Sequence, residues 1–192
     1  MDFLIKELDL DFSITELIEY YKTLENSYQH LCWKEASADA IDADLHKITG
    51  LYGWGIQSNL LDLTRPCPPY HVHKDSTGNY RDTELMFGFA EKIKQAFPYS
   101  HQHSISAHPP GTEISLHTDS PGYLKIHMPI TNNDNSYFVF EEKKFILKAG
   151  CAYLINTTKL HGTYNDGNDT RVHLFFKIPA DHVDTVLKVK SL

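Results

Sequence analysis

The chain has 192 residues, of which 41% are hydrophobic and 22% are charged. This length suits a single domain spanning residues 1–192, and the balance excludes collagen-like, coiled-coil and wholly disordered chains. The formal net charge is −7 at pH 7, and because general binding of nucleic acids or anionic membranes rests on an excess of Lys and Arg, we expect neither partner. The 12 histidines stand out against three arginines, so the question is whether some of them are organised as metal ligands.

No segment of the sequence has the pattern of a targeting signal or a membrane span. Acidic residues interrupt the N-terminal stretch MDFLIKELDLDF, and no run of 18 apolar residues occurs. Cys32, Cys67 and Cys151 are scattered and form no Cys-x-x-Cys pair or disulfide framework. Free thiols without an export signal favour the reducing cytoplasm, which is the predicted location.

The first part of the chain, about residues 1–100, is predicted to supply supporting helices. A capping box at residues 13–16 is followed by apolar residues at helical spacing, which predicts a helix over about 14–31. A second helix is expected over about 82–96, before Pro98. Between them, the pattern predicts a strand over 56–63 and a proline-rich loop over 64–70.

From about residue 101 the sequence changes to short segments rich in β-branched and aromatic residues, separated by turn residues. Strands at this spacing favour a sandwich or jelly roll over a sheet built from βαβ units. We therefore expect a mainly β core over about 101–179, with the helices packed against it and a short C-terminal helix over 180–189. The predicted strands cover residues 104–108, 113–117, 124–130, 137–141, 144–148, 151–156 and 171–178.

His117-Thr118-Asp119 is the first motif that carries chemistry. Residues two apart on a strand point to the same face, about 7 Å apart, so an imidazole and a carboxylate can converge on one ion. His161, in the predicted loop 157–168, is the best candidate for a third ligand. Arg171 follows it and opens the last predicted strand.

Two histidines and one carboxylate on one side of an ion form the facial triad typical of non-haem Fe(II) oxygenases, which leaves coordination positions open. The fork of an arginine grips a carboxylate bidentately, as a dicarboxylate co-substrate such as 2-oxoglutarate requires. Each residue also has an ordinary interpretation, as a surface strand histidine, a turn residue, a loop histidine or an ion-pair arginine. What favours a metal site is the joint order of His117, Asp119, His161 and Arg171.

With these residues, the sequence resembles the aspartyl/asparaginyl β-hydroxylase family of Fe(II)/2-oxoglutarate dioxygenases. The resemblance lies within residues 104–178, in the stretches 106–117, 124–130 and 150–156, at His161 and over 171–176. It implies a double-stranded β-helix fold, with Fe(II) as cofactor and 2-oxoglutarate and O2 as co-substrates. It assigns iron to His117, Asp119 and His161, the far carboxylate of 2-oxoglutarate to Arg171, and further contacts with the co-substrate to Ser106 and His127.

Two features distinguish this sequence within the resemblance. The usual arginine of the family in the middle strand is here Lys125, which keeps the charge but loses the fork, so its part in holding the co-substrate stays open. The vertebrate branch lacks the metal carboxylate, whereas Asp119 is present here. This places the sequence nearer to bacterial-type members, several of which hydroxylate free amino acids, and argues against a halogenase, in which a halide replaces the carboxylate.

The resemblance implies hydroxylation of an unactivated C–H bond of an amino acid or amino-acid residue, with release of succinate and CO2. The alternative from another class is a cupin-like metal-binding or sensor protein without turnover, and a weaker one is a non-oxidative metal enzyme such as an isomerase. Arg65 and Arg81 are the arginines left for a substrate, although they could equally be surface ion-pair residues. The pairs His71-x-His73 and His101-x-His103 lack an accompanying acidic residue, so no second metal site is expected.

Overall fold

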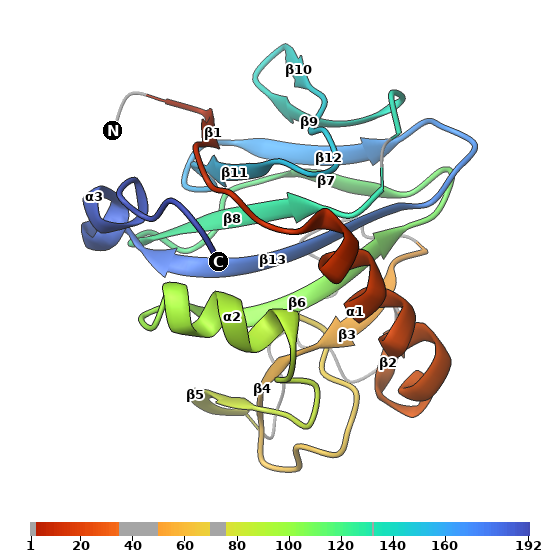
Figure 1. The fold of residues 1–192 in the computed structure, drawn as a ribbon. Coiled ribbons are helices and arrows are strands. Elements are labelled where there is room, and N and C mark those ends of the chain that lie inside the picture. The colour runs from red at the N-terminus through yellow and green to blue at the C-terminus, as the bar shows by residue number, and fades with distance from the viewer. Residues whose placement is uncertain (1–2, 35–49, 70–75, 132) are drawn as a thin grey trace.

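Two β-sheets face each other in the computed structural model, which describes residues 3–34, 50–69, 76–131 and 133–192 (Figure 1). The larger sheet has the strand order β1 (Ile5–Leu8), β11 (Ala152–Ile155), β8 (Tyr123–Pro129), β13 (Arg171–Pro179), β6 (His101–His108), β3 (Tyr52–Gly55) and β2 (Cys32–Lys34). The smaller sheet has the order β10 (Lys143–Phe145), β9 (Ser136–Phe140), β12 (His161–Asn165) and β7 (Glu113–His117). A separate two-stranded sheet joins β4 (Gln57–Leu60) to β5 (Ser76–Asp82).

From β6 onward, the chain passes back and forth between the two main sheets. β6, β8, β11 and β13 belong to the larger sheet, and β7, β9, β10 and β12 belong to the smaller one. All pairings in both sheets are antiparallel. This winding is that of a double-stranded β-helix, so the expected mainly β jelly roll is confirmed, as are the seven strands predicted within it.

One strand of this core, β12, was predicted as part of a loop. Its sequence HGTYN contains a glycine and no alternating aliphatic residues, so strand propensity does not reveal it. In the structure it lies between β7 and β9, and four of its five residues are buried. Pairing on both edges therefore outweighs the weak local preference of this segment.

The two faces of the larger sheet differ in character because side chains alternate along a strand. In β13, Val172, Leu174 and Phe176 belong to the main hydrophobic core. Arg171 and His173, which alternate with them, point to the opposite face and contact the Phe138 ring of the smaller sheet. One face of the sheet thus packs on apolar side chains, while the other brings polar side chains into the space between the sheets.

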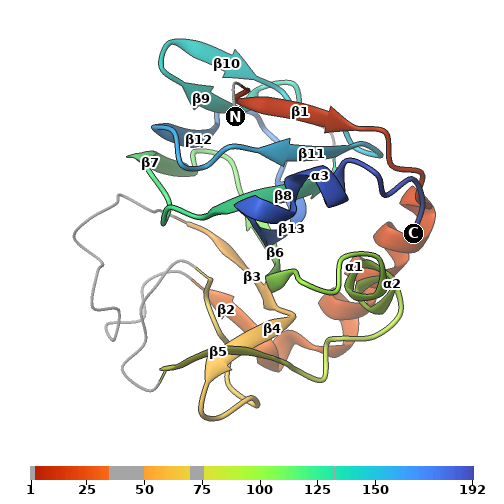
Figure 2. The same cartoon turned by 90° about the vertical axis from the view of Figure 1, so that its left-hand side faces the viewer.

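Two helices, α1 (Ile14–Ser27) and α2 (Phe89–Ala96), cover the apolar face of the larger sheet (Figure 2). The Ser13 hydroxyl accepts a hydrogen bond of 3.2 Å from the backbone N–H of Glu16, as the predicted capping box requires. The Glu16 carboxylate lies 2.5 Å from Nζ of Lys92 and so connects the two helices. The expected packing of N-terminal helices on the β core is confirmed.

Several predicted boundaries were wrong. The first helix ends at Ser27 and gives way to a 3-10 turn (Gln29–Leu31) and β2. The second begins only at Phe89, because residue 82 still belongs to β5 and Thr83 Oγ1 donates to the Ile56 carbonyl, 2.9 Å away. The C-terminal helix is reduced to a 3-10 turn (Ala180–His182) and α3 (Val183–Val186).

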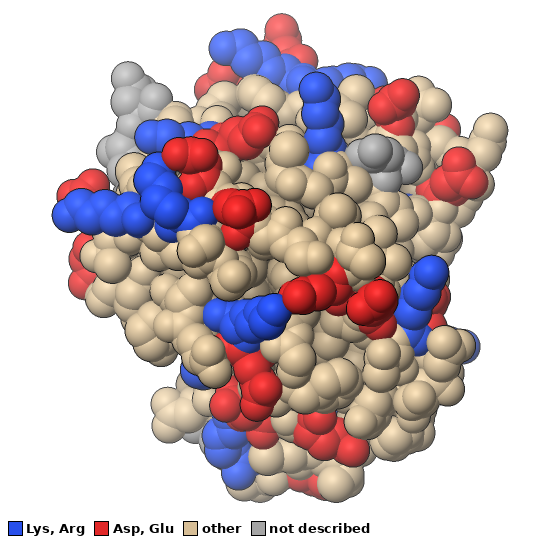
Figure 3. Space-filling view, in the orientation of Figure 1, with Lys and Arg blue, Asp and Glu red and all other residues tan. Residues whose placement is uncertain are grey.

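Basic and acidic side chains are mixed on the face that carries α1 and α2 (Figure 3). No broad patch of a single sign is visible on this face. Within the described residues, none of the helices is long and apolar enough to cross a membrane.

Candidate metal centre and co-substrate pocket

The last residue of β7 and the first residue of β12 are both histidines and lie directly opposite each other. His117 pairs with His161 in the antiparallel register, and the centroids of their rings are 4.3 Å apart. The two histidines are far apart in the sequence. They meet because β7 and β12 pair with each other.

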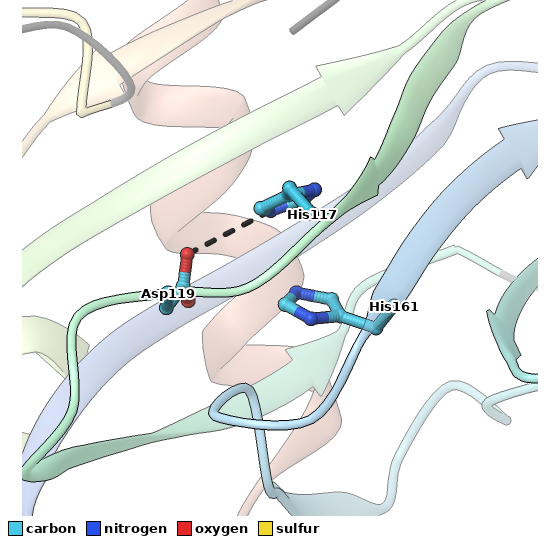
Figure 4. Close-up of side chains that lie close together, drawn as sticks. All are labelled: His117, Asp119 and His161. Atoms are coloured by element: carbon cyan, nitrogen blue, oxygen red, sulfur yellow. Dashed lines mark ion pairs between the residues drawn. The ribbon is translucent and has the colours of Figure 1, made fainter. Parts of the chain in front are cut away.

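Asp119 completes the group from the segment that follows β7 (Figure 4). Its backbone N–H donates to the Thr157 carbonyl, 2.8 Å away, and its Oδ1 lies 3.7 Å from Nε2 of His117. The strand ends at His117, as predicted, so Asp119 lies just beyond it and the spacing of alternate residues on a strand does not describe this motif. Nevertheless, ligand atoms of His117, Asp119 and His161 all lie within 4.8 Å of one another.

Hydrogen bonds orient both imidazoles. Nδ1 of His117 lies 2.8 Å from the Ser115 carbonyl, and Nδ1 of His161 lies 2.9 Å from the Lys159 carbonyl. Because a carbonyl oxygen only accepts, each Nδ1 carries the proton and each Nε2 keeps its lone pair. Burial, followed by the charge of Lys125, lowers the pKa of His161 to about 4, so this ligand is neutral at physiological pH.

Lys125, on β8, is tied to the carboxylate of this group. Its Nζ lies 2.8 Å from Oδ2 of Asp119, and both side chains are largely buried. Burial by itself raises the pKa of Asp119, but the adjacent ammonium outweighs it and holds that pKa well below the usual range. The carboxylate is therefore ionised, with Oδ1 on the side of His117 and Oδ2 on the side of Lys125.

A pocket of about 370 Å³, part of it open to solvent, adjoins these residues between the two sheets. Arg171 lies in its wall, and Nη2 of this guanidinium donates to Nδ1 of His108, 2.8 Å away. His127 stacks on Phe175 with ring centroids 5.3 Å apart. The remaining lining residues are His117, His161, Lys125, Ile114, Phe138, Thr157 and Thr163.

Three histidines around Arg171 are held neutral. Burial is the main cause that lowers the pKa values of His108, His127 and His173 well below the usual range, and the charge of Arg171 adds to it. Arg171 therefore keeps its positive charge among neutral, aromatic neighbours. A cation in such a setting attracts an anion more strongly than it would in water.

The structure brings most of the sequence-predicted site residues together, with one partial exception. His117, His161, Lys125, His127 and Arg171 line the pocket, and Asp119 adjoins it. Ser106 is buried on β6, two residues before His108 and opposite His173, but it does not line the pocket. His108 is the site residue that sequence reasoning missed; its strand position was predicted, but its contact with Arg171 depends on the register between β6 and β13.

The residues suggested for a substrate do not lie at this pocket. Arg81 donates through Nη2 to the Leu61 carbonyl, 3.2 Å away, and also to that of Leu60. Arg65 lies in the loop after β4, as predicted, outside the pocket wall. No observation assigns a substrate role to either residue.

The two other histidine pairs of the sequence are His101-x-His103, which the structure describes, and His71-x-His73, which it does not. Nε2 of His103 is hydrogen-bonded to the Ser100 hydroxyl, 2.7 Å away, and the ring stacks on Phe176. His103 is therefore a packed residue of the protein interior. His71 and His73 lie outside the described residues. Among the residues that the structure describes, the group around His117 is the one with metal-ligand geometry.

Residues 87–180 match the family model described as aspartyl/asparaginyl beta-hydroxylase. The match covers 94 of the 192 residues, just under half of the chain. The family segment runs from the start of α2 to the end of β13 and contains all three residues of the metal centre as well as Arg171. The resemblance seen in the sequence is thus confirmed. Comparison with curated protein sequences gave no significant match.

Solved structures that resemble this chain do so at low sequence identity. A 2OG-Fe(II) oxygenase family oxidoreductase from Burkholderia pseudomallei is 11% identical, with 87% of this chain and 91% of that chain covered and a TM-score of 0.49. A predicted oxalate decarboxylase from Thermotoga maritima is 14% identical, with 80% and 96% covered and a TM-score of 0.45. Both are similar in architecture alone.

Proposed function

We propose that this protein is an Fe(II)- and 2-oxoglutarate-dependent dioxygenase that hydroxylates an unactivated C–H bond of an amino acid or amino-acid residue. The observation that carries the proposal is that His117 and His161 line one pocket with the buried Arg171, and that Asp119 lies within ligand distance of both histidines. The match of residues 87–180 to the aspartyl/asparaginyl β-hydroxylase model supports hydroxylation as the reaction. The products would be the hydroxylated substrate, succinate and CO2.

The residues of the triad fit an Fe(II) ion. They offer two imidazole nitrogens and one ionised carboxylate from one side, which is the donor set that non-haem Fe(II) oxygenases use. When bound, the iron would supply the activation of O2 that protein side chains cannot provide. The hydrogen bonds from Nδ1 of both histidines would keep the two imidazoles oriented toward the ion.

Arg171 would hold the far carboxylate of 2-oxoglutarate. Its guanidinium is buried in the pocket wall, kept in place by His108, and flanked by the Phe138 ring 5.4 Å from the guanidinium carbon. A planar fork suits bidentate recognition of a carboxylate. Phe138 and Phe175 would exclude water from the pocket and so strengthen this attraction.

Lys125 would serve mainly the metal carboxylate. Its ammonium is 2.8 Å from Asp119 Oδ2, so it fixes the rotation of that carboxylate while Oδ1 remains available to the ion. It also lines the pocket, where it adds a second positive charge for an anionic co-substrate. A lysine suffices for both purposes, because a point charge needs no fork.

The alternative function is a cupin-like metal-binding or sensor protein without turnover. The two functions differ in whether 2-oxoglutarate binds next to the metal. Under anaerobic conditions, addition of 2-oxoglutarate to the Fe(II)-loaded protein should give a weak visible charge-transfer band. Arg171→Ala should abolish this band while Fe(II) binding persists.

Succinate formation in the presence of O2 then tests turnover, with the twenty standard amino acids added one at a time as stimulants. A mass gain of about 16 daltons in the stimulating amino acid would identify it as the hydroxylated substrate. Absence of both the band and succinate, in protein shown to bind Fe(II), would leave the sensor function as the better account.

A further inference from the structure

A second and larger pocket lies next to the candidate metal centre. It encloses about 830 Å³, part of it open to solvent, against about 370 Å³ for the co-substrate pocket. Ser120, the residue directly after the metal carboxylate, lies in its wall. The other lining residues are Gly78, Asn79, Tyr80, His101, Gln102, Tyr123 and Lys177.

The two pockets are separated by a pair of lysines on neighbouring strands. Lys125 of β8 and Lys177 of β13 are direct partners in the antiparallel register, so their side chains leave the same face of the larger sheet. Lys125 lines the co-substrate pocket and Lys177 lines the second one. The second pocket therefore includes the direct strand neighbour of Lys125, the residue that pairs with Asp119.

Lys177 forms no ion pair with any of the residues that the structure describes, although the negative charge of Asp119 acts on it from a greater distance. Asp119 is engaged by Lys125, and among the residues that the structure describes no carboxylate lies within 4.0 Å of the Lys177 ammonium or lines the pocket. Burial, and then repulsion from Lys125, lowers the pKa of Lys177 to about 8, so the ammonium is still mostly charged at pH 7. A partly buried cation of this kind is stabilised by an anionic ligand.

An irregularity in β6 shapes the wall opposite this lysine. Phe175 pairs with Ser104, yet Lys177 pairs with His101, so β6 carries one extra residue here, and Gln102 has a φ of +56°. Bulges of this kind re-aim side chains and occur frequently beside active sites. The bulge places His101 opposite Lys177 and in edge contact with Tyr123, with ring centroids 4.8 Å apart.

The rings in this wall would contact the apolar part of a ligand. Tyr80 packs on the other side of the wall against His101, with ring centroids 5.7 Å apart. Burial is the main cause that lowers the pKa of His101 to about 4, so at neutral pH this ring is an uncharged surface. A pocket lined by one cation and by aromatic rings matches a small molecule with a carboxylate and an apolar body.

We propose that the pocket between β5, β6, β8 and β13 binds the primary substrate, and that Lys177 recognises a free carboxylate of that substrate. The proposal rests on the proposed dioxygenase function and narrows it to free amino acids, as opposed to residues within a protein chain. It makes Lys177 the specificity-determining residue in place of Arg65 and Arg81.

Binding can be measured without turnover, by saturation-transfer difference NMR on Zn(II)-loaded protein with and without 2-oxoglutarate. The probes are the twenty standard L-amino acids and their carboxamides. We expect at least one amino acid to bind, and its carboxamide to bind at least about 10-fold more weakly because it lacks the charge. Lys177→Gln should weaken binding of the amino acid by about 10- to 100-fold, and Lys177→Arg should restore part of it.

Lys22→Gln is the matched control, since Lys22 is an exposed lysine on α1, away from both pockets. Retained Zn(II) and 2-oxoglutarate binding in Lys177→Gln would show that the variant is folded. The proposal is overturned if no free amino acid binds, if the carboxamide binds equally well, or if Lys177→Gln binds as the wild type does. Failure of the dioxygenase function would be seen separately, as wild-type protein that binds metal but not 2-oxoglutarate.

Discussion

Nζ of Lys125 lies 2.8 Å from Oδ2 of Asp119, so a side chain from the larger sheet holds the carboxylate that follows a strand of the smaller one. The side chains are only 11% and 15% exposed, respectively, so this ion pair is shielded from solvent. It connects the two sheets at the point where His117, Asp119 and His161 meet. Both the stability of the metal-free protein and the state of Asp119 should therefore depend on Lys125.

Lys125→Met should destabilise the metal-free protein by about 3 kcal/mol, because it leaves a buried carboxylate without its partner. Urea unfolding of wild type and variant measures this difference. The double variant Lys125→Met/Asp119→Leu should recover part of the loss, since it removes both charges. Strictly additive effects of the two substitutions would show that the residues do not interact.

Replacement of His117, Asp119 or His161 by Ala should each lower metal affinity by more than about 100-fold, since loss of outer partners alone costs about 10- to 100-fold. Calorimetric titration with Co(II) measures the affinity. His182→Ala is the control, because this partly exposed histidine pairs with Asp181 at the C-terminal end of the chain. Equal affinities in the control and in the three variants would exclude this metal centre.

His108 should act as a positioning residue for Arg171, since its Nδ1 accepts from Nη2 at 2.8 Å. His108→Leu should weaken 2-oxoglutarate binding by about 10-fold, the size of one lost hydrogen bond to a charged group, and leave metal affinity unchanged. His108→Gln keeps a hydrogen-bond acceptor, so its affinity for 2-oxoglutarate should lie between those of the wild type and His108→Leu. A titration of the charge-transfer band gives all three values, and a loss of metal binding in His108→Leu would indicate a general structural effect instead.

Gly162 sets how closely the two histidine-bearing strands approach. A Cβ at this position would lie 2.9 Å from the Ile114 carbonyl oxygen in β7, closer than Cβ contacts normally are. Gly162→Ala should therefore shift β12 relative to β7 and lower metal affinity by about 10-fold or more, as misplaced ligands do.

Gly111→Ala is the matched control for this effect. Gly111 has a φ of +78° and open space around it, so the substitution introduces backbone strain but no contact. It should cost about 1 kcal/mol of stability and leave Co(II) affinity as in the wild type. If both alanine variants bind Co(II) normally, the spacing of β7 and β12 does not limit the site.

Acid should destabilise the metal-free protein between pH 6.5 and 4. Histidine in an unfolded chain titrates near pH 6.5, whereas the buried His103, with its pKa lowered to about 3 mainly by burial, stays neutral in the folded protein. The unfolded state thus binds more protons in this range, and stability falls as the pH is lowered. Four other buried histidines act in the same sense, namely His108, His127, His161 and His173.

Urea midpoints at pH 7.5 and 5.5 measure this dependence. Each histidine held neutral contributes up to about 1.4 kcal/mol per pH unit. His103→Phe should reduce the dependence by about that amount. A midpoint that is constant or rises toward pH 5.5 would contradict the neutral, buried state of these histidines.

Local pattern was enough to predict every strand of the β core from β6 to β13 except β12, together with the residue types of the candidate metal centre. Alternation of apolar and polar residues marks a strand in any sequence, which is why β7 was predicted with its observed bounds Glu113–His117. Likewise, the residue types His117, Asp119, His161 and Arg171 carry their chemistry with them. Their order along the chain was a sufficient basis for predicting a site.

Only the tertiary structure decided the contacts that make the site work. Strand β12 forms because β7 and β9 pair with both of its edges, and this pairing places His161 opposite His117. The contacts of Lys125 with Asp119 and of His108 with Arg171 also join segments distant in sequence. A sequence specifies which side chains can react or bind, but the register of paired strands sets their distances, and register depends on the packing of the whole sheet.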